Sequence, residues 1–130
     1  MNIKNYKIIE GKIVEFSTSF GVGIGTWYNN EVKEGLQYGI EFDILPKLKF
    51  GNNAKIVSEN TYSVKHDGKV NELRGVVDGV DEDGLIYFRL GIDCLIMVES
   101  AEETIKEGDW LSLTVNTEDL IITPYGSSIL

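Results

Sequence analysis

A chain of 130 residues that is 42% hydrophobic and 25% charged has the size and composition of one globular domain whose core needs no disulfide or metal. Acidic side chains outnumber basic ones by 21 to 12, and the net charge of -9 repels nucleic-acid phosphates and anionic membranes. We therefore expect a basic protein partner in preference to a nucleic acid or a membrane.

The sequence also carries an expectation about location. The apolar run at residues 95–98 is far too short to cross a bilayer. Residues 1–12 contain lysines but no apolar segment typical of a secretory signal. These features predict a cytoplasmic protein, and a chain rich in Lys, Asn and Ile is typical of a bacterial source.

The first predicted elements are strands punctuated by glycine. Residues 6–16 read as one strand bulged or bent at Gly11, and residues 22–27 as another. Gly21, Gly23 and Gly25 alternate, so they share one strand face, which is either closely packed or open to a ligand. The run is not a phosphate loop, because neither glycine-rich phosphate motif is present and a strand pattern follows.

The next elements are a strand and a hairpin. Residues 36–44 alternate apolar and polar side chains, the period of a half-buried strand, and residues 45–50 could make one helical turn. Asp67-Gly68 predicts a tight hairpin turn, since both residue types tolerate positive φ. His66 is the only histidine, and its place beside this turn predicts an exposed side chain.

An acidic segment at residues 78–84 follows. It cannot be a calcium loop of EF-hand type, because that motif needs Gly at its sixth position and Glu at its twelfth. Counted from Asp78, these positions hold Asp83 and Arg89. Asp and Gly are typical of a solvated turn. The segment is therefore an ordinary acidic turn, a surface for a basic partner, or a cation site.

Residues 85–98 form either one long bent strand or two strands broken at Gly91. Every second residue of this segment is apolar, so one strand face is wholly apolar: Ile86, Phe88, Leu90, Ile92, Cys94, Ile96 and Val98. Cys94 is the only cysteine, so it cannot form an internal disulfide, and its strand position predicts a buried thiol. Large residues on the second face suggest a strand covered on both sides, for example by another copy of the chain.

The C-terminal third predicts one helical turn and one hairpin. Residues 100–105 could begin with Ser100 as N-cap and Glu103 completing a capping box. Residues 110–115 alternate, and residues 116–119 read as the loop of a hairpin that leads into residues 120–125.

The predicted fold is a single all-β domain over residues 1–130. About nine short strands, with at most one or two helical turns, favour an antiparallel β-sandwich or a small closed barrel. The glycine pattern suggests a weak internal duplication of residues 6–58 and 70–125. The second half has the pattern of a small Greek-key barrel of oligonucleotide-binding type, a likeness of pattern alone.

Catalytic chemistry finds little support. His66 and Cys94 lie far apart in the sequence, the first beside a turn and the second in a strand. Asp93 is the one carboxylate placed within an apolar run, and its simpler interpretation is a bend or edge position. We expect no enzyme, no cofactor and no metal.

The favoured function is a non-enzymatic binding domain with an acidic surface, such as a bacterial immunity protein that blocks a basic nuclease toxin. The alternatives are a small ligand-binding barrel with an aromatic and glycine face, and a structural subunit of a homo-oligomer. Exposed aromatics beside acids are typical of protein-binding patches. The predicted partner-binding residues are Asp78, Asp81, Glu82, Asp83, Glu102, Glu103, Trp27 and Tyr28.

Overall fold

The computed structural model describes residues 1–3, 5–28 and 37–128, and almost all of its regular structure is β-strand, which confirms the all-β prediction. The strands are β1 (Asn2–Ile3), β2 (Asn5–Glu10), β3 (Ile13–Thr18), β4 (Gly21–Trp27), β5 (Gln37–Ile44), β6 (Ala54–Ile56), β7 (Ser63–His66), β8 (Val70–Val80), β9 (Leu85–Arg89), β10 (Leu95–Glu99), β11 (Trp110–Asn116) and β12 (Leu120–Ser128). One 3-10 turn, η1 (Thr117–Asp119), is the single helical element of the described residues. The helical turns expected at residues 45–50 and 100–105 do not form, and these segments contain bends and isolated bridges instead.

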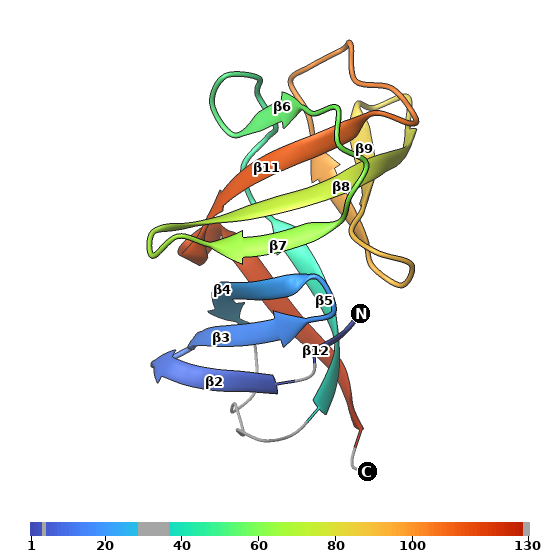
Figure 1. The fold of residues 1–130 in the computed structure, drawn as a ribbon. Coiled ribbons are helices and arrows are strands. Elements are labelled where there is room, and N and C mark those ends of the chain that lie inside the picture. The colour runs from blue at the N-terminus through green and yellow to red at the C-terminus, as the bar shows by residue number, and fades with distance from the viewer. Residues whose placement is uncertain (4, 29–36, 129–130) are drawn as a thin grey trace.

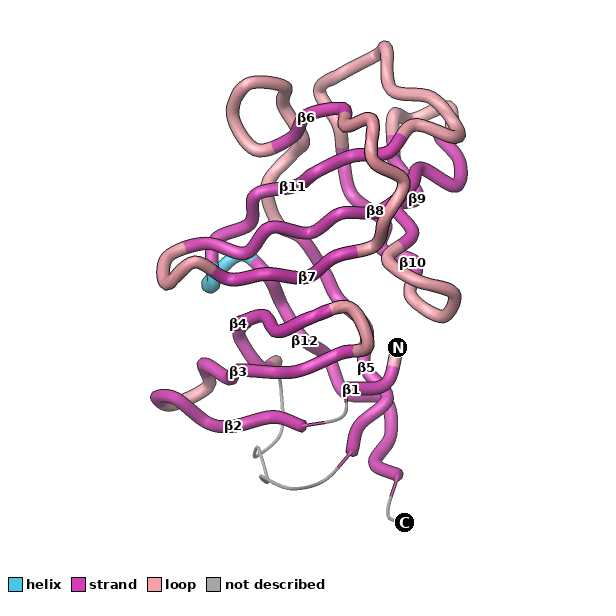
Figure 2. Tube along the Cα trace, viewed as in Figure 1, coloured by secondary structure: helices cyan, strands magenta, loops and turns pink. Residues whose placement is uncertain are grey.

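All of the strands belong to one open, 12-stranded sheet, so a sandwich or closed barrel is not confirmed. The order along the main path is β1-β5-β12-β4-β7-β8-β11-β6. β3 and β2 extend from β4, while β9 and β10 extend from β8. In Figure 1, β2 to β4 and β7, β8 and β11 lie one above another, and β5 and β12 run diagonally across them. The tube in Figure 2 shows how little of the chain is helical.

Two glycine-marked segments form hairpins. The segment expected to bend at Gly11 instead reverses there, because Gly11 adopts φ of 54° in the turn between β2 and β3. The hairpin expected at Asp67-Gly68 is confirmed between β7 and β8. Its turn is fixed by the Asp67 carboxylate, which accepts hydrogen bonds from the backbone N–H groups of Lys69 and Val70, both at 2.9 Å.

The apolar segment at residues 85–98 is broken into two strands, the second of the two predicted forms. Gly91 has φ of 91° in the turn between β9 and β10, and this conformation is one that glycine adopts readily. The side chains of the apolar face predicted for this segment are buried, except for Ile92, which is 89% exposed at the turn. Leu95 and Met97 are exposed, so the second face of β10 is not covered in this structure.

The C-terminal hairpin prediction is wrong. β11 pairs with β8 and β6, whereas β12 pairs with β5 and β4. In the strand order, one part of the sheet ends at β4 and the other begins at β7. The turn η1 takes the chain from β11, in the second part, to β12, in the first. A short polar loop between two alternating segments is therefore compatible with strands that do not pair with each other.

The duplication of residues 6–58 and 70–125 remains a prediction. The two glycines that mark corresponding points have different structural roles. Gly11 lies in a turn, whereas Gly75 lies within β8, where a Cβ atom would collide with the carbonyl oxygen of Arg89.

The alternating glycines of β4 are closely packed. A Cβ at Gly23 would lie 2.6 Å from the Phe16 ring, and one at Gly25 would lie 2.8 Å from the carbonyl oxygen of Leu120. Both glycines are buried. Packing, and not an open ligand face, accounts for the glycine pattern of this strand.

The junction between the two parts of the sheet is bridged by a buried asparagine. β4 and β7 share a single register pair, Gly21 with Val64. Asn71, which is 0% exposed, accepts a hydrogen bond from Ile24 N–H at 2.9 Å and donates to the Ile24 carbonyl at 2.7 Å. It also donates to the Val115 carbonyl at 3.2 Å. One side chain thus links β4 to β8 and β11.

We predict that Asn71→Ala lowers the free energy of unfolding by about 2–4 kcal/mol, since the peptide groups of Ile24 would lose their partner inside the protein. Urea denaturation followed by circular dichroism measures the change. Asn60→Ala, at an exposed position, is the matched control and should change stability by less than about 0.5 kcal/mol. An equally small effect of Asn71→Ala would contradict the bridging role.

Candidate functional site

The acidic segment folds as a tight turn between β8 and β9, which agrees with its simplest interpretation. Asp81 organises the turn, because its Oδ1 accepts hydrogen bonds from the N–H groups of Asp83 at 2.9 Å and Leu85 at 3.0 Å. Its Oδ2 accepts a hydrogen bond from the Tyr87 hydroxyl at 3.3 Å. The negative charge of Asp81 is the main cause that raises the pKa of Tyr87. Asp81 is thus engaged within the chain.

Asp78 is also engaged within the chain. Its carboxylate accepts hydrogen bonds from Arg89 Nη2 at 3.0 Å and from Nε at 3.3 Å. These hydrogen bonds are the main cause that lowers the pKa of Asp78. The bidentate pair neutralises much of the charge of Asp78 and leaves it little to offer a partner.

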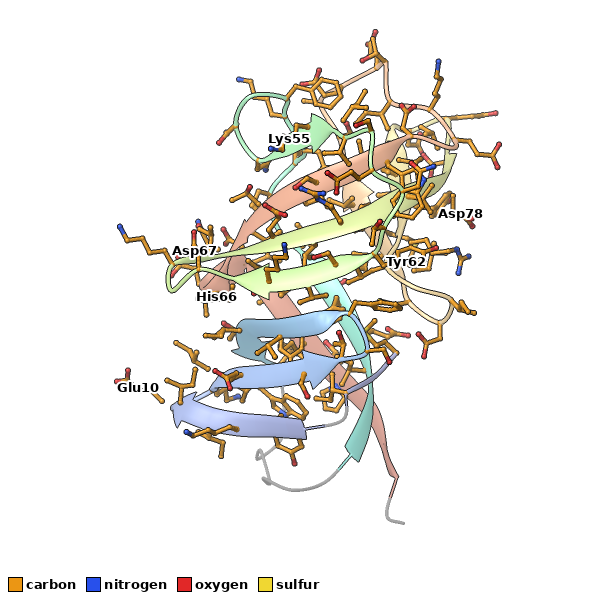
Figure 3. All side chains as sticks on the ribbon, in the orientation of Figure 1. Glu10, Lys55, Tyr62, His66, Asp67 and Asp78 are labelled. Carbon is orange, nitrogen blue, oxygen red and sulfur yellow. The ribbon has the colours of Figure 1, made fainter. Side chains whose placement is uncertain are left out.

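Glu82 and Asp83 complete the turn and differ from the other two acids. Both are exposed, and in the described part of the chain neither carboxylate makes a hydrogen bond or an ion pair. Their charges are therefore free to act on a partner. Figure 3 shows Asp78, next to this turn, on the opposite side of the view from Glu10.

Of the two predicted partner-binding acids in the β10–β11 connection, Glu102 is engaged within the chain and Glu103 is exposed. Glu102 is half-buried, and its Oε2 accepts a hydrogen bond from the Phe50 N–H at 3.0 Å. Glu103 is exposed and does not complete a capping box, because no helix forms there. The Ser100 hydroxyl instead accepts a hydrogen bond from the Glu102 N–H at 2.9 Å.

Of the predicted aromatic pair, only Tyr28 is accessible. Tyr28 is 59% exposed, whereas Trp27 is 1% exposed and stacks on Tyr6 with ring centroids 5.5 Å apart. Trp27 is therefore removed from the candidate surface, because strand alternation turns its side chain into the core. Trp110 is half-buried and packs against Tyr62, with the two ring centroids 5.1 Å apart.

An apolar groove of about 540 Å³ lies beside Tyr28, where the ends of β4, β5, β9, β10 and β12 meet. It is lined by Tyr28, Asp43, Ile44, Leu45, Leu85, Met97, Glu99, Ile121 and Thr123. Leu45 is 63% exposed and Met97 is 59% exposed, and together with the other apolar lining residues they form an exposed apolar patch. The groove was not predicted from the sequence, although Leu85 and Met97 on the mixed second face of residues 85–98 were a signal for it.

The acidic turn borders this groove. A smaller depression of about 300 Å³ is lined by Lys47, Asp81, Asp83, Gly84, Leu85, Glu99 and Ser100. It shares Leu85 and Glu99 with the groove, so the two hollows are neighbours. Lys47 lies 3.8 Å from Glu99, but both side chains are about two-thirds exposed and the pair is weak.

The three residues considered above for catalysis, Cys94, His66 and Asp93, are each placed by contacts that have a structural role. Cys94 is 4% exposed, and burial is the main cause that raises the pKa of its thiol to about 11. His66 is half-buried rather than exposed: its Nδ1 accepts a hydrogen bond from Gly68 N–H, and its Nε2 lies 3.2 Å from the Thr117 hydroxyl. Asp93 is exposed, and its backbone oxygen accepts a hydrogen bond from the Met1 amino group at 3.1 Å.

Within the residues that the structure describes, no group of His, Cys, Asp or Glu side chains is arranged to hold a metal ion. Over the same residues, no helix is both long and apolar enough to cross a membrane. Comparisons with protein-family models, with curated proteins and with solved structures each found no match.

We predict that the thiol reagent DTNB modifies Cys94 at pH 8 at least about 100-fold more slowly in the native protein than in denaturing urea, because the native thiol is buried and protonated. Absorbance of the released thiolate follows the reaction. The Cys94→Ala variant provides the blank. A native rate within about tenfold of the unfolded rate would contradict the inert, structural role.

Proposed function

We propose that this protein is a non-enzymatic binding domain that docks a basic protein on the surface formed by the acidic turn and the apolar groove. The most concrete form is a bacterial, cytoplasmic immunity protein that neutralises a cationic nuclease toxin. A nuclease active site must attract phosphate, so it presents positive charge. An acidic surface can occupy such a site in place of the nucleic acid.

The observation that carries this proposal is the free carboxylate of Asp83 at the depression next to an exposed apolar groove, with the free carboxylate of Glu82 beside it on the same turn. Glu82 and Asp83 make no bond within the described chain, and Leu45 and Met97 lie exposed in the adjoining groove. Charge steers the approach of a partner, while apolar contact provides most of the binding energy. The net charge of -9 acts in the same direction over longer distances.

The two alternatives are less well supported. A ligand-binding face containing Trp27, Tyr28 and the alternating glycines keeps only Tyr28 well exposed, because Trp27, Gly23 and Gly25 are buried. A homo-oligomer would use the exposed face of β10, where Leu95 and Met97 lie. Light scattering of the purified protein measures that possibility directly.

We predict that the tagged protein captures a basic protein from its own source cells and that the double variant Glu82→Lys, Asp83→Lys does not. Mass spectrometry identifies the captured protein, which is then purified and mixed with the bait. The association rate should fall about tenfold or more in the double variant, and the wild-type rate should fall with added salt. For the immunity form, an equimolar amount of the bait should abolish the nuclease activity of the partner.

The matched control is Glu10→Lys, Glu15→Lys, which changes the net charge equally at two exposed positions of β2 and β3. Asp81 is left unchanged in both variants, because its loss would disrupt the turn. Equal loss of binding in both double variants would indicate an effect of net charge alone. Binding that survives reversal of Glu82 and Asp83 would exclude the acidic turn as the docking site.

A further inference from the structure

The outer face of β10 is directed into the groove by strand alternation. Ile96 and Val98 are buried, so the intervening side chains of Leu95, Met97 and Glu99 lie on the opposite face. β10 pairs with β9 along one edge. At its other edge, Leu48 N–H donates to the Glu99 carbonyl at 2.8 Å, and Ala101 N–H donates to the Leu48 carbonyl at 3.0 Å. These bonds fix the end of β10 where Glu99 meets the acidic turn.

The groove has room for large apolar side chains. Its volume of about 540 Å³ lies inside the range of roughly 300–1,000 Å³ found for ligand pockets. Ile44, Leu85 and Ile121 contribute to its lining, and the exposed Leu45 and Met97 stand beside them. Met is flexible and adapts to varied partner shapes, as in promiscuous binding surfaces. The chemistry of this lining selects an apolar group.

The rim of the groove selects a positive charge next to that apolar group. Asp43 and Glu99 line the groove, and Glu82 and Asp83 stand on the adjoining turn. Lys47, which lines the smaller depression, is paired with Glu99 in an exposed and weak contact. A second copy of this chain is disfavoured as occupant, because each copy carries a net charge of -9 and two copies repel each other.

We propose that the groove binds a segment of the basic partner in which a large apolar side chain is flanked by Lys or Arg. The apolar side chain enters between Met97, Leu45 and Ile121, and the flanking cations contact the carboxylates of Asp43 and Glu99. This inference rests on the proposed function, and it adds an apolar anchor to the electrostatic docking. It assigns a role to Leu45 and Met97, which the acidic turn alone leaves unexplained.

Blocked Gly/Ser-rich peptides with a central Lys-Leu-Lys, Lys-Ser-Lys or Glu-Leu-Glu sequence provide the probes. Each peptide is titrated to millimolar concentration into the labelled full chain, and amide and methyl NMR shifts give the site and the affinity. The Lys-Leu-Lys peptide should shift the signals of Leu45, Leu85 and Met97. Replacing its Leu by Ser, or its Lys by Glu, should weaken binding at least tenfold.

Met97→Ser should also weaken binding of the Lys-Leu-Lys peptide at least tenfold. Ile92→Ser is the matched control, since Ile92 is 89% exposed but does not line the groove, and it should leave the affinity unchanged. Unchanged circular dichroism and thermal midpoints verify that both variants fold. Equal losses in the two variants would contradict the assignment of Met97.

Three results would overturn the groove assignment. They are the absence of groove shifts at millimolar Lys-Leu-Lys peptide, affinity that depends on Lys but not on Leu, and concentration-dependent shifts that reveal self-association through Met97. None of these results decides the proposed function, because capture of a basic protein through Glu82 and Asp83 is measured independently. Loss of that capture with intact peptide binding would leave the groove as a peptide site without a toxin partner.

Discussion

The hydrogen bonds of Asn71 join the two parts of the sheet where the strand ladder is thin. β4 and β7 share one register pair, so the peptide groups of Ile24 beyond it depend on this side chain. A fully buried amide is costly unless it is bonded, and here both its oxygen and its nitrogen are used. Gly23 belongs to the same arrangement, because a Cβ there would lie 3.0 Å from the Asn71 oxygen. The close packing at Gly23 is thus part of the way in which the sheet is joined.

The candidate surface is built on the strand that carries this bridge. β8 carries Asn71 near its start, in the core, and ends at the acidic turn. The position of the turn is therefore fixed by the sheet. The register between β8 and β9 shifts between Val77 and Gly79, a bulge that coincides with Asp78 and its ion pair to Arg89. Bulges often lie next to functional sites, where they redirect a side chain. β9 and β10 then bring Met97 and Glu99 to the groove, next to the free acids of the turn.

Short-range patterns predicted the strands well. Alternation placed Ile40, Phe42 and Ile44 in the core, and the same rule placed most of one parity of residues 85–98 there. Ile92 is the exception, because the chain reverses at Gly91 and parity is not continuous through a turn. Turn residues located the β7–β8 hairpin and the acidic turn. The β11–β12 hairpin failed because local signals cannot report which strands pair, and here both strands have partners distant in the sequence.

The sequence by itself determined the all-β class, the acidic surface charge and the identity of the turn residues, because these depend on the properties of neighbouring side chains. Only the tertiary structure decided that the sheet is open, that Trp27 is buried beside an exposed Tyr28, and that Asp78 and Asp81 are engaged while Glu82 and Asp83 are free. It also brought Leu45, Met97 and Ile121 to one groove. These features depend on contacts between strands far apart in the chain, which the periodicity of a single segment does not encode.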